Sequence, residues 1–466
     1  MNLFMWGTLV FCNLIMAFTL SLAAKPHNHV IIENTLPPSQ LDNPQVKALA
    51  KRYRKRQFQT ALLLSIIETP LLLPIRDSWF MLLFFVMLFL TIGAGYGLQI
   101  RYIRKMRQLI EDNQWHLDVA PVQINTQLVR DKNVQMVSWK WFLLAGALSL
   151  GLFFLTRSFP DSLVVLLVVL FSEAIMVGGW YFVGRLPVRA LTNDQEINRQ
   201  YNDLTKHHWA LIMVVIGMIL PLTIYLPLLA VERWQNQFAL LTFLEFGLLL
   251  FIVFFSLGLL LFIVFFSLGW LLALRGKQDR LLAQAKDFRY QGDDYYWRYG
   301  VYYNPNDTRF MVPDRIGLNL SVNLATQSGK ILMGLVGVIL MASLIITIVP
   351  MFILDYDPDP FVYTVDAQKV TLDGPFFRER AIALPNIQKL ELIEKLPGKG
   401  VRTNGLATDQ YAMGKFRING KPADLLIINE SKPILVIETY DRDYYFTSKR
   451  PQKTKQAYQE IRTAME

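Results

Sequence analysis

Eight long apolar runs constrain this chain more than any other feature. They are Leu3–Ala24, Thr60–Ile75, Trp79–Ile100, Trp141–Thr156, Ser162–Val183, Trp209–Val231, Phe238–Leu274 and Ile331–Leu354. About 20 apolar residues are needed for a helix to cross the hydrocarbon core of a bilayer. Hydrophobic residues make up 53% of the chain and charged residues only 18%, which is too apolar for an ordinary soluble protein of this length. The runs predict a polytopic α-helical membrane protein with about eight transmembrane helices.

Two of these assignments have alternatives. The second and fourth runs are short, and Thr60–Ile100 can form a two-span hairpin with Arg76-Asp77-Ser78 as its tight turn. The first run can instead be a cleaved signal peptide, because Ser21-Leu22-Ala23-Ala24 resembles a cleavage site. It lacks a basic segment at its start and is long for a signal, which favours a retained span.

Lys and Arg gather in alternate connections between the runs. The connections 25–58, 101–140, 185–208 and 275–330 carry seven, seven, four and nine, whereas the others carry one each, at Arg76, Arg157 and Arg233. Basic connections stay in the cytoplasm. With eight spans, the N-terminus and the C-terminal domain are then both extracytoplasmic. The net charge of +10 lies beside apolar runs, so we expect the anionic inner leaflet as its partner and no nucleic acid.

The seventh run contains an internal duplication. Gly247–Leu257 reads GLLLFIVFFSL, and Gly258–Leu268 repeats it without change. Eleven residues are almost three helical turns, so the insertion keeps one face of the helix in phase. As a single helix the run of about 37 residues measures roughly 55 Å. Because a bilayer core is roughly 30 Å thick, this helix must tilt, protrude or break.

Beyond Asp355 the composition changes to that of a soluble domain. Leu390 and Leu392 alternate with charged residues, which predicts a strand. Asn419-Gly420 between two apolar stretches predicts a hairpin, and Asp441-Arg442-Asp443 predicts a second one. Pro451 opens a helix whose predicted apolar stripe is Ala457, Tyr458, Ile461 and Met465. Several antiparallel strands closed by one amphipathic helix predict a small barrel-like α+β domain.

This order of elements resembles the bacterial pleckstrin-homology-like domain. The residues that carry the resemblance are Tyr363–Leu372, Ala383-Leu384-Pro385-Asn386-Ile387, Arg402-Thr403-Asn404-Gly405, Gly414-Lys415-Phe416 and Ile434–Thr447 with the final helix. The resemblance implies a binding or scaffolding fold and not catalysis. Together with the apolar runs and the basic connections, the resemblance predicts four parts of the chain. They are seven helices with basic connections (1–274), a cytoplasmic juxtamembrane segment (275–330), an eighth helix (331–354) and the pleckstrin-homology-like domain (355–466).

The juxtamembrane segment is rich in aromatic residues around the turn Asn304-Pro305-Asn306-Asp307. Aromatic rings suit the bilayer interface, and arginines can meet lipid phosphates. The predicted lipid contacts are Trp297, Tyr302, Tyr303, Arg309 and Arg315; a site for a cytoplasmic partner is the alternative. Together with the stretch from Leu36-Pro37-Pro38 to Tyr53, the segment resembles a block in bacterial multi-pass proteins of unknown function. Some relatives of that group are linked to self-immunity against secreted toxins. Because the group as a whole has no known function, the resemblance implies an architecture and little about function.

Three carboxylates lie within the runs, at Glu68, Glu173 and Glu245. A charge at membrane depth is costly, so each is a candidate functional residue. No Lys, Arg or His lies at comparable depth to pair with them. They either line a path for a cation or a proton, or are neutral and hydrogen-bonded between helices. Prolines near Glu68 (Pro70, Pro74) and in the sixth run (Pro221, Pro227) could break helices and expose carbonyl groups to ions.

The sequence contains no Gly-rich phosphate loop, nucleophile elbow or two-histidine zinc motif. Its single cysteine, Cys12, permits neither an intramolecular disulfide nor a cysteine-based metal site. We therefore expect no enzyme, no cofactor and no metal. One predicted function is a non-enzymatic sensor, immunity or scaffolding protein whose C-terminal domain binds an extracellular protein, peptide or other envelope ligand. The alternative is a secondary transporter or ion-coupled permease that uses the three glutamates.

Overall fold

The computed structural model describes residues 2–466 except 121–132, 134, 159–161, 237–241, 286, 376–378 and 399. For residues 227, 230–236, 242–257, 260, 401 and 403 it describes the backbone alone. The chain forms two compact units, which are described separately. The first comprises Met1–Asn13, Leu63–Thr91 and Val336–Glu466, and the second comprises Leu14–Leu62 and Ile92–Leu335.

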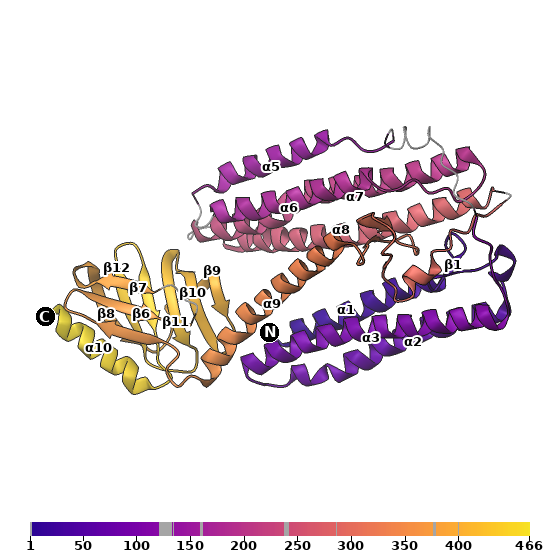
Figure 1. The fold of residues 1–466 in the computed structure, drawn as a ribbon. Helices are drawn as coiled ribbons and strands as arrows, with labels where there is room; N and C mark the ends of the chain where they lie inside the picture. The colour runs from indigo at the N-terminus through magenta and orange to yellow at the C-terminus, as the bar shows by residue number, and fades with distance from the viewer. Residues whose placement is uncertain are drawn as a thin grey trace. The chain divides into compact units, whose positions relative to one another are not determined.

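Long helices form most of the chain before residue 357. They are α1 (Asn2–Ser21), α2 (Pro44–Ile67), α3 (Asp77–Asp112), α5 (Lys140–Thr156), α6 (Ser162–Gly184), α7 (Gln195–Asn236), α8 (Thr242–Leu282) and α9 (Gln327–Tyr356). Among the described residues, six helices are long and apolar enough to cross a membrane, in α1, α3, α6, α7, α8 and α9. The helix α5, with 17 residues, is shorter. The helical N-terminal region that the runs predict is therefore present (Figure 1), and its long apolar helices suggest association with a membrane.

The second apolar run does not form one helix. The helix α2 ends at Ile67, and a short 3-10 helix, η3 (Thr69–Leu72), follows it. Pro70 ends α2 because it has no N–H to donate and its ring collides with the carbonyl of the preceding turn. The chain then reverses before α3, and Asn2 Nδ2 of α1 donates to the Leu73 carbonyl at 3.1 Å. The start of α1 is thereby fixed to the loop that joins α2 and α3.

The sixth and seventh runs form unbroken helices. The helix α7 continues through Pro221 and Pro227, so the interruption predicted there is wrong. One missing hydrogen bond at a proline is tolerated where the rest of a long helix and its neighbours hold the backbone. Both copies of the duplicated segment lie within α8, whose 41 residues form one helix. The two identical eleven-residue segments are therefore parts of one continuous helix.

In the second unit α5, α6, α7 and α8 lie side by side (Figure 1). Their packing uses small contact areas on each helix, for example Val183, Trp209 and Leu274 in one buried cluster. Many other apolar side chains of α5 and α6 are exposed, such as Phe154 at 61% and Phe171 at 69%. Apolar outer faces of this extent suit a lipid environment and not water.

Segments from all four basic connections meet in the second unit. Short strands and helices form there, namely β1 (Val30–Ile31), β2 (Asn34–Thr35), β3 (Met311–Pro313), β4 (Leu320–Val322), η1 (Leu22–Ala24), η2 (Pro38–Gln40) and η4 (Asp294–Trp297). Hydrogen bonds join the segments at His27–Asp279 (2.8 Å), Arg189–Pro313 (2.6 Å) and Lys206–Asn133 (2.8 Å). The four connections therefore form one polar layer and are not independent loops.

The C-terminal domain contains a larger mixed sheet, a smaller antiparallel sheet and one α-helix. Its strands are β5 (Val362–Val365), β6 (Lys369–Asp373), β7 (Arg380–Ala383), β8 (Ile387–Ile393), β9 (Gly400–Ala407), β10 (Tyr411–Ile418), β11 (Lys421–Ile428), β12 (Ile434–Thr439) and β13 (Asp443–Phe446). The larger sheet has the order β8-β12-β13-β11-β10-β9, in which β11 and β13 are parallel, and the smaller one is β5-β6-β7. After β7 comes the 3-10 helix η5 (Leu384–Asn386), and α10 (Pro451–Met465) ends the chain.

The predicted hairpins of this domain are confirmed. Asn419 and Gly420 have φ of 51° and 82° and join β10 to β11 with Ile418 opposite Lys421. A two-residue turn with both φ positive matches the twist of a hairpin, and Asn-Gly is the pair that adopts it most readily. The second hairpin joins β12 and β13, where Glu438 pairs with Asp443.

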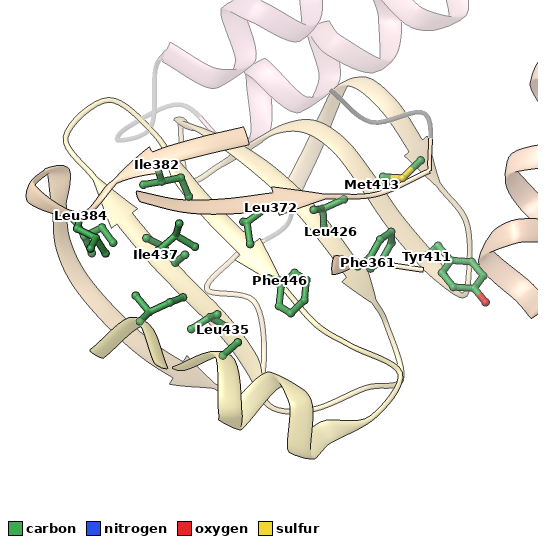
Figure 2. Close-up of a cluster of buried hydrophobic side chains, with 14 of the residues drawn as sticks. Phe361, Leu372, Ile382, Leu384, Tyr411, Met413, Leu426, Leu435, Ile437 and Phe446 are labelled. Carbon is green, nitrogen blue, oxygen red and sulfur yellow. The ribbon is translucent and has the colours of Figure 1, made fainter. Parts of the chain in front are cut away.

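One apolar core holds the sheets and α10 together. It includes Phe361, Leu372, Leu426, Leu435, Ile437 and Phe446, which Figure 2 shows gathered between the strands and the helix. Ala457 and Ile461 of α10 are fully buried against it, and Tyr458 packs at its edge. Met465 does not belong to the stripe, because the last turn of α10 leaves it 42% exposed. Leu354, in the last turn of α9, is fully buried in the same core.

Candidate functional site

The C-terminal domain is bonded to the helices beneath it through a buried tyrosine. Tyr411 begins β10 and is 5% exposed. Its hydroxyl lies 3.0 Å from the Leu354 carbonyl and 3.1 Å from Asp355 Oδ1, so one phenolic proton is shared between two acceptors at the end of α9. Burial, together with the negative charge of Asp355, raises the pKa of Tyr411, which keeps the hydroxyl a donor.

The other oxygen of Asp355 reaches the start of α3. Ser78 N donates to Asp355 Oδ2 at 2.9 Å, since the first N–H groups of a helix have no partner within it. A carboxylate is also favoured at this end of a helix because the peptide dipoles leave it partly positive. Asp355 therefore links a strand of the C-terminal domain to the N-terminus of α3.

An aromatic pair reinforces the link. Trp79 Nε1 donates to the Tyr356 hydroxyl at 2.8 Å, and the Arg76 guanidinium lies 4.8 Å from the centre of the Tyr356 ring. Phe352, one turn earlier in α9, meets Trp79 edge-on at 5.6 Å. Trp79 and Tyr356 are both about half exposed, which suits residues at a membrane surface.

Lys449, which lies between β13 and α10, also bonds to the end of α9. Its Nζ donates to the carbonyls of Asp355 at 3.0 Å and Asp357 at 2.7 Å. Burial lowers the pKa of Lys449, and the nearby carboxylates of Asp355 and Asp357 oppose that shift. We call Ser78, Trp79, Asp355, Tyr356, Tyr411 and Lys449 the Asp355 junction. These contacts hold the C-terminal domain at the ends of α3 and α9. Among the six junction residues, no nucleophile is placed beside a general base.

Glu68 is buried between three helices of the first unit. Its Oε2 accepts a hydrogen bond from Asn13 Nδ2 of α1 at 2.8 Å. Asn13 also donates to Ser65 Oγ at 3.1 Å and accepts the hydroxyl proton of Thr91 of α3 at 2.6 Å. Glu68 Oε1 is buried without a partner. The cluster joins α1, α2 and α3 through neutral donors, which corresponds to the inter-helical alternative and brings no second charge to Glu68.

Glu173 and Glu245 belong to the second unit, whereas Glu68 belongs to the first. Glu173 is 7% exposed on α6, and Ser149 of α5 donates to its Oε1. Tyr225 of α7 packs against Val169, one turn from Glu173. Glu245 belongs to α8, but its side chain lies outside the described residues.

The bonds of Glu68 predict the effect of its replacement. Gln keeps a carbonyl acceptor for Asn13, so Glu68→Gln should change the free energy of unfolding by less than about 1 kcal/mol. Glu68→Leu leaves the Asn13 amide without this acceptor and should cost about 1–2 kcal/mol. Thermal unfolding of the full chain in detergent measures both. A Gln variant as unstable as the Leu variant would show that the charge itself holds the three helices.

Most of the predicted lipid contacts are buried inside the protein. Trp297 and Tyr302 are 1% and 4% exposed and pack with each other at 5.1 Å between ring centres. Tyr303 is 45% exposed, and the half-exposed Arg309 forms an ion pair with Asp307 at 2.6 Å. The interpretation of this segment as a lipid anchor is therefore corrected for Trp297 and Tyr302, because their rings form a core of their own. Tyr303 and Arg309 keep that prediction.

Arg315 is also buried and cannot reach lipid. Its guanidinium lies 2.5 Å from Asp294 Oδ1 and donates to the Glu33 carbonyl at 3.0 Å and to Thr35 Oγ1. Asp294 also accepts the Thr35 N–H at 3.0 Å. Arg315 therefore fastens the hairpin β1–β2 to the segment after α8. The charge of Asp293 adds to that of Asp294 and raises the pKa of Arg315 against the effect of burial.

The hairpin β1–β2 has an unusual backbone conformation and buried side chains at its tip. Ile32 and Glu33, at its tip, have φ of 45° and 57° and are 0% and 1% exposed. A β-branched residue rarely adopts a left-handed conformation. Burial raises the pKa of Glu33 well above its ordinary value, and the same cause raises that of Asp314 to about 6. Among the residues that the structure describes, no three His, Cys, Asp or Glu side chains are grouped to hold a metal ion.

Sequence reasoning missed the Asp355 junction and the role of Arg315. A carboxylate directly after the last apolar run, with a tyrosine next to it, was a usable signal for the junction. Its partners Ser78 and Tyr411 lie 277 and 56 residues away in the chain, and nothing local connects them. Glu33 and Thr35, which accept hydrogen bonds from Arg315, lie 282 and 280 residues away.

Comparison with known proteins identifies the C-terminal domain. No curated protein and no solved structure matches the chain significantly. Residues 361–461 match the family model of the bacterial PH domain, and this range contains every strand from β5 to β13 and most of α10.

Proposed function

We propose that this chain is a non-enzymatic sensor, immunity or scaffolding protein of a bacterial cell membrane, which binds an envelope partner through its C-terminal PH domain. One observation carries the proposal. Asp355 accepts hydrogen bonds from Tyr411 of the domain and from Ser78 of α3. A partner that shifts β10 would therefore act directly on the ends of α3 and α9. Folds of this kind bind ligands on their surface, and a rigid link to the helices is what a sensor or a scaffold requires.

The proposal includes an orientation with the domain outside the cell. The mutual contacts of the four basic connections support one common side for them, because His27, Arg189 and Lys206 each bond to another connection. The N-terminus of α1, the loop before α3 and the end of α9 belong to the other unit, where Arg76 is the single basic residue of the loop. We also propose that the segment 293–323 makes the chain a member of the multi-pass group that its sequence resembles.

Cysteine labelling tests the orientation. Cys12→Ser removes the one native thiol, and Tyr440→Cys adds another at a side chain that is 88% exposed in the β12–β13 turn. A membrane-impermeant maleimide should label Tyr440→Cys in intact cells. The matched control, Asn113→Cys after α3, should react only after lysis. Labelling of Asn113→Cys in intact cells with protection of Tyr440→Cys would reverse the orientation.

In-cell crosslinking tests the partner. A photoreactive amino acid at Tyr440 or at the exposed Arg402 of β9 should capture an envelope protein or peptide in living cells, and one at Asn113 should not capture the same species. The captured species should bind the purified full-length protein. The Tyr411→Phe variant, which lacks the shared proton of the junction, should still bind it. No captured species at any domain position would contradict a binding role.

A secondary transporter remains the second candidate, and it has one observation in its favour. Glu68 Oε1 is buried without a partner, and such an oxygen can take up a proton or a cation. Flux of an ion in proteoliposomes that disappears in Glu68→Gln, while the protein stays folded, would support it. Unchanged flux, or none in the parent protein, would leave the binding role.

A further inference from the structure

The extensions of α2 and α3 that follow the apolar runs pack against each other. Tyr53 of α2 and Tyr102 of α3 lie 5.3 Å apart between ring centres, and Gln57 Nε2 donates to the Gly95 carbonyl at 3.3 Å. The buried stripe of α2 continues through Ala50. Because the two helices run in opposite directions, residues near 53 face residues near 102, and residues near 57 face residues near 95.

This packing leaves a group of cations exposed at one level. They are Lys51, Arg52, Arg54, Lys55 and Arg56 of α2 with Arg101 and Arg104 of α3, which we call the α2–α3 basic face. None of the seven has an ion pair or a hydrogen bond within the described chain. The helix α2 contains no Asp or Glu at all. Seven unpaired cations so close together repel one another and favour an anionic occupant.

Apolar side chains begin directly beside the basic face on the same two helices. Leu62 and Phe58 of α2 are 64% and 36% exposed, and Ile92 and Tyr96 of α3 are 42% and 38% exposed. Lys55 and Leu62 are seven residues apart, which is about two turns on one side of α2 and about 10 Å along its axis. A ligand that covers both surfaces needs an anionic head and an apolar tail within that distance.

We propose that the α2–α3 basic face, with the apolar residues below it, is a binding site for an anionic phospholipid. Its phosphate lies among Lys51, Arg52 and Lys55, which share one exposed side of α2, and its acyl chains lie along Phe58 and Leu62 on that same side. A nucleic acid or an acidic protein would satisfy the cations but would leave the neighbouring apolar side chains without a partner. Arginine suits this role because its fork of donors matches a phosphate. The proposal does not depend on the function of the PH domain.

Lipid titration of the full-length protein in a neutral detergent tests this site. Native mass spectrometry should show phosphatidylglycerol bound more tightly than phosphatidylcholine. Each cation near a lipid headgroup contributes about 1 kcal/mol, so Lys51→Gln/Arg52→Gln/Lys55→Gln should weaken phosphatidylglycerol binding about 100-fold. Phosphatidylcholine binding should not change. Arg52→Lys keeps the charge and should retain most of the affinity.

A control variant separates this site from a general effect of charge. Lys369→Gln/Lys432→Gln/Lys455→Gln removes three exposed cations from the C-terminal domain and should leave phosphatidylglycerol binding unchanged. Equal losses in both triple variants would overturn the proposal. It would also fail if the parent protein bound both lipids equally, or if a DNA oligonucleotide bound more tightly than lipid and lost its affinity in the α2 triple variant alone.

Discussion

Replacing Arg315 by Gln should lower the free energy of unfolding more than any other single substitution that removes a charge. The guanidinium is 4% exposed and is the cation that neutralises Asp294 while it bonds the Glu33 carbonyl. Removing one partner of a buried ion pair leaves the other charge unpaired, which costs about 3–5 kcal/mol. Thermal unfolding of the detergent-solubilised chain, followed by tryptophan fluorescence, measures the loss.

Arg309 provides the matched control for this substitution. Arg309→Gln removes the same charge from the same segment, but its pair with Asp307 is half exposed. Exposed pairs contribute about 0–1 kcal/mol. Similar unfolding temperatures for Arg315→Gln and Arg309→Gln would show that the hairpin β1–β2 is held by other contacts.

Phe446→Ala should selectively unfold the C-terminal domain. Phe446 is 1% exposed, lies at the centre of the core in Figure 2 and meets Tyr363 edge-on at 5.8 Å. Truncating a buried phenylalanine to alanine costs about 3–5 kcal/mol because it removes apolar contacts and leaves a cavity. Limited proteolysis of the full-length protein should then cleave residues 361–461 faster, while the helical region stays resistant.

Tyr440→Ala is the control for Phe446→Ala. It also removes an aromatic ring from the domain, but that ring is 88% exposed and contributes no core packing. It should be cleaved at the rate of the parent protein. Cleavage of Phe446→Ala at the same rate would mean that the core of Figure 2 does not limit the stability of the domain.

Local signals predicted the C-terminal domain well. Asn419-Gly420 specifies its turn through backbone conformation alone, and Pro451 fixes the start of α10 because proline fits the first turn of a helix. The apolar stripe predicted for α10 is wrong at Met465, which is exposed. The periodicity of apolar residues along a helix continues to its last turn even where no core lies beneath that turn. The family match confirms the fold at 361–461 and leaves the partner of the domain as a proposal.

Packing between distant segments could not be predicted in the same way. Gly93 and Gly97 stand four residues apart in α3, a spacing that favours close approach of a neighbouring helix, yet nothing lies within 4 Å of a Cβ added at either. Gly95 between them is the close approach, because a Cβ there would lie 2.9 Å from Leu20 of α1. Spacing within one helix gives the face that is available but not the neighbour that occupies it. The burial of Trp297 and Tyr302 has the same cause, since their surroundings come from other parts of the chain.

The place of Leu354 in the C-terminal core determines where a soluble fragment of this protein should begin. The family match starts at residue 361, but Leu354 is fully buried in the core, and its carbonyl receives the Tyr411 hydroxyl. A fragment cut at 361 would expose an apolar gap and an unpaired phenol. One that begins a turn before Leu354 would retain both contacts and add only Met351, Phe352 and Ile353 as apolar residues. Crystallisation and ligand screening of the isolated domain are therefore best started from the longer fragment.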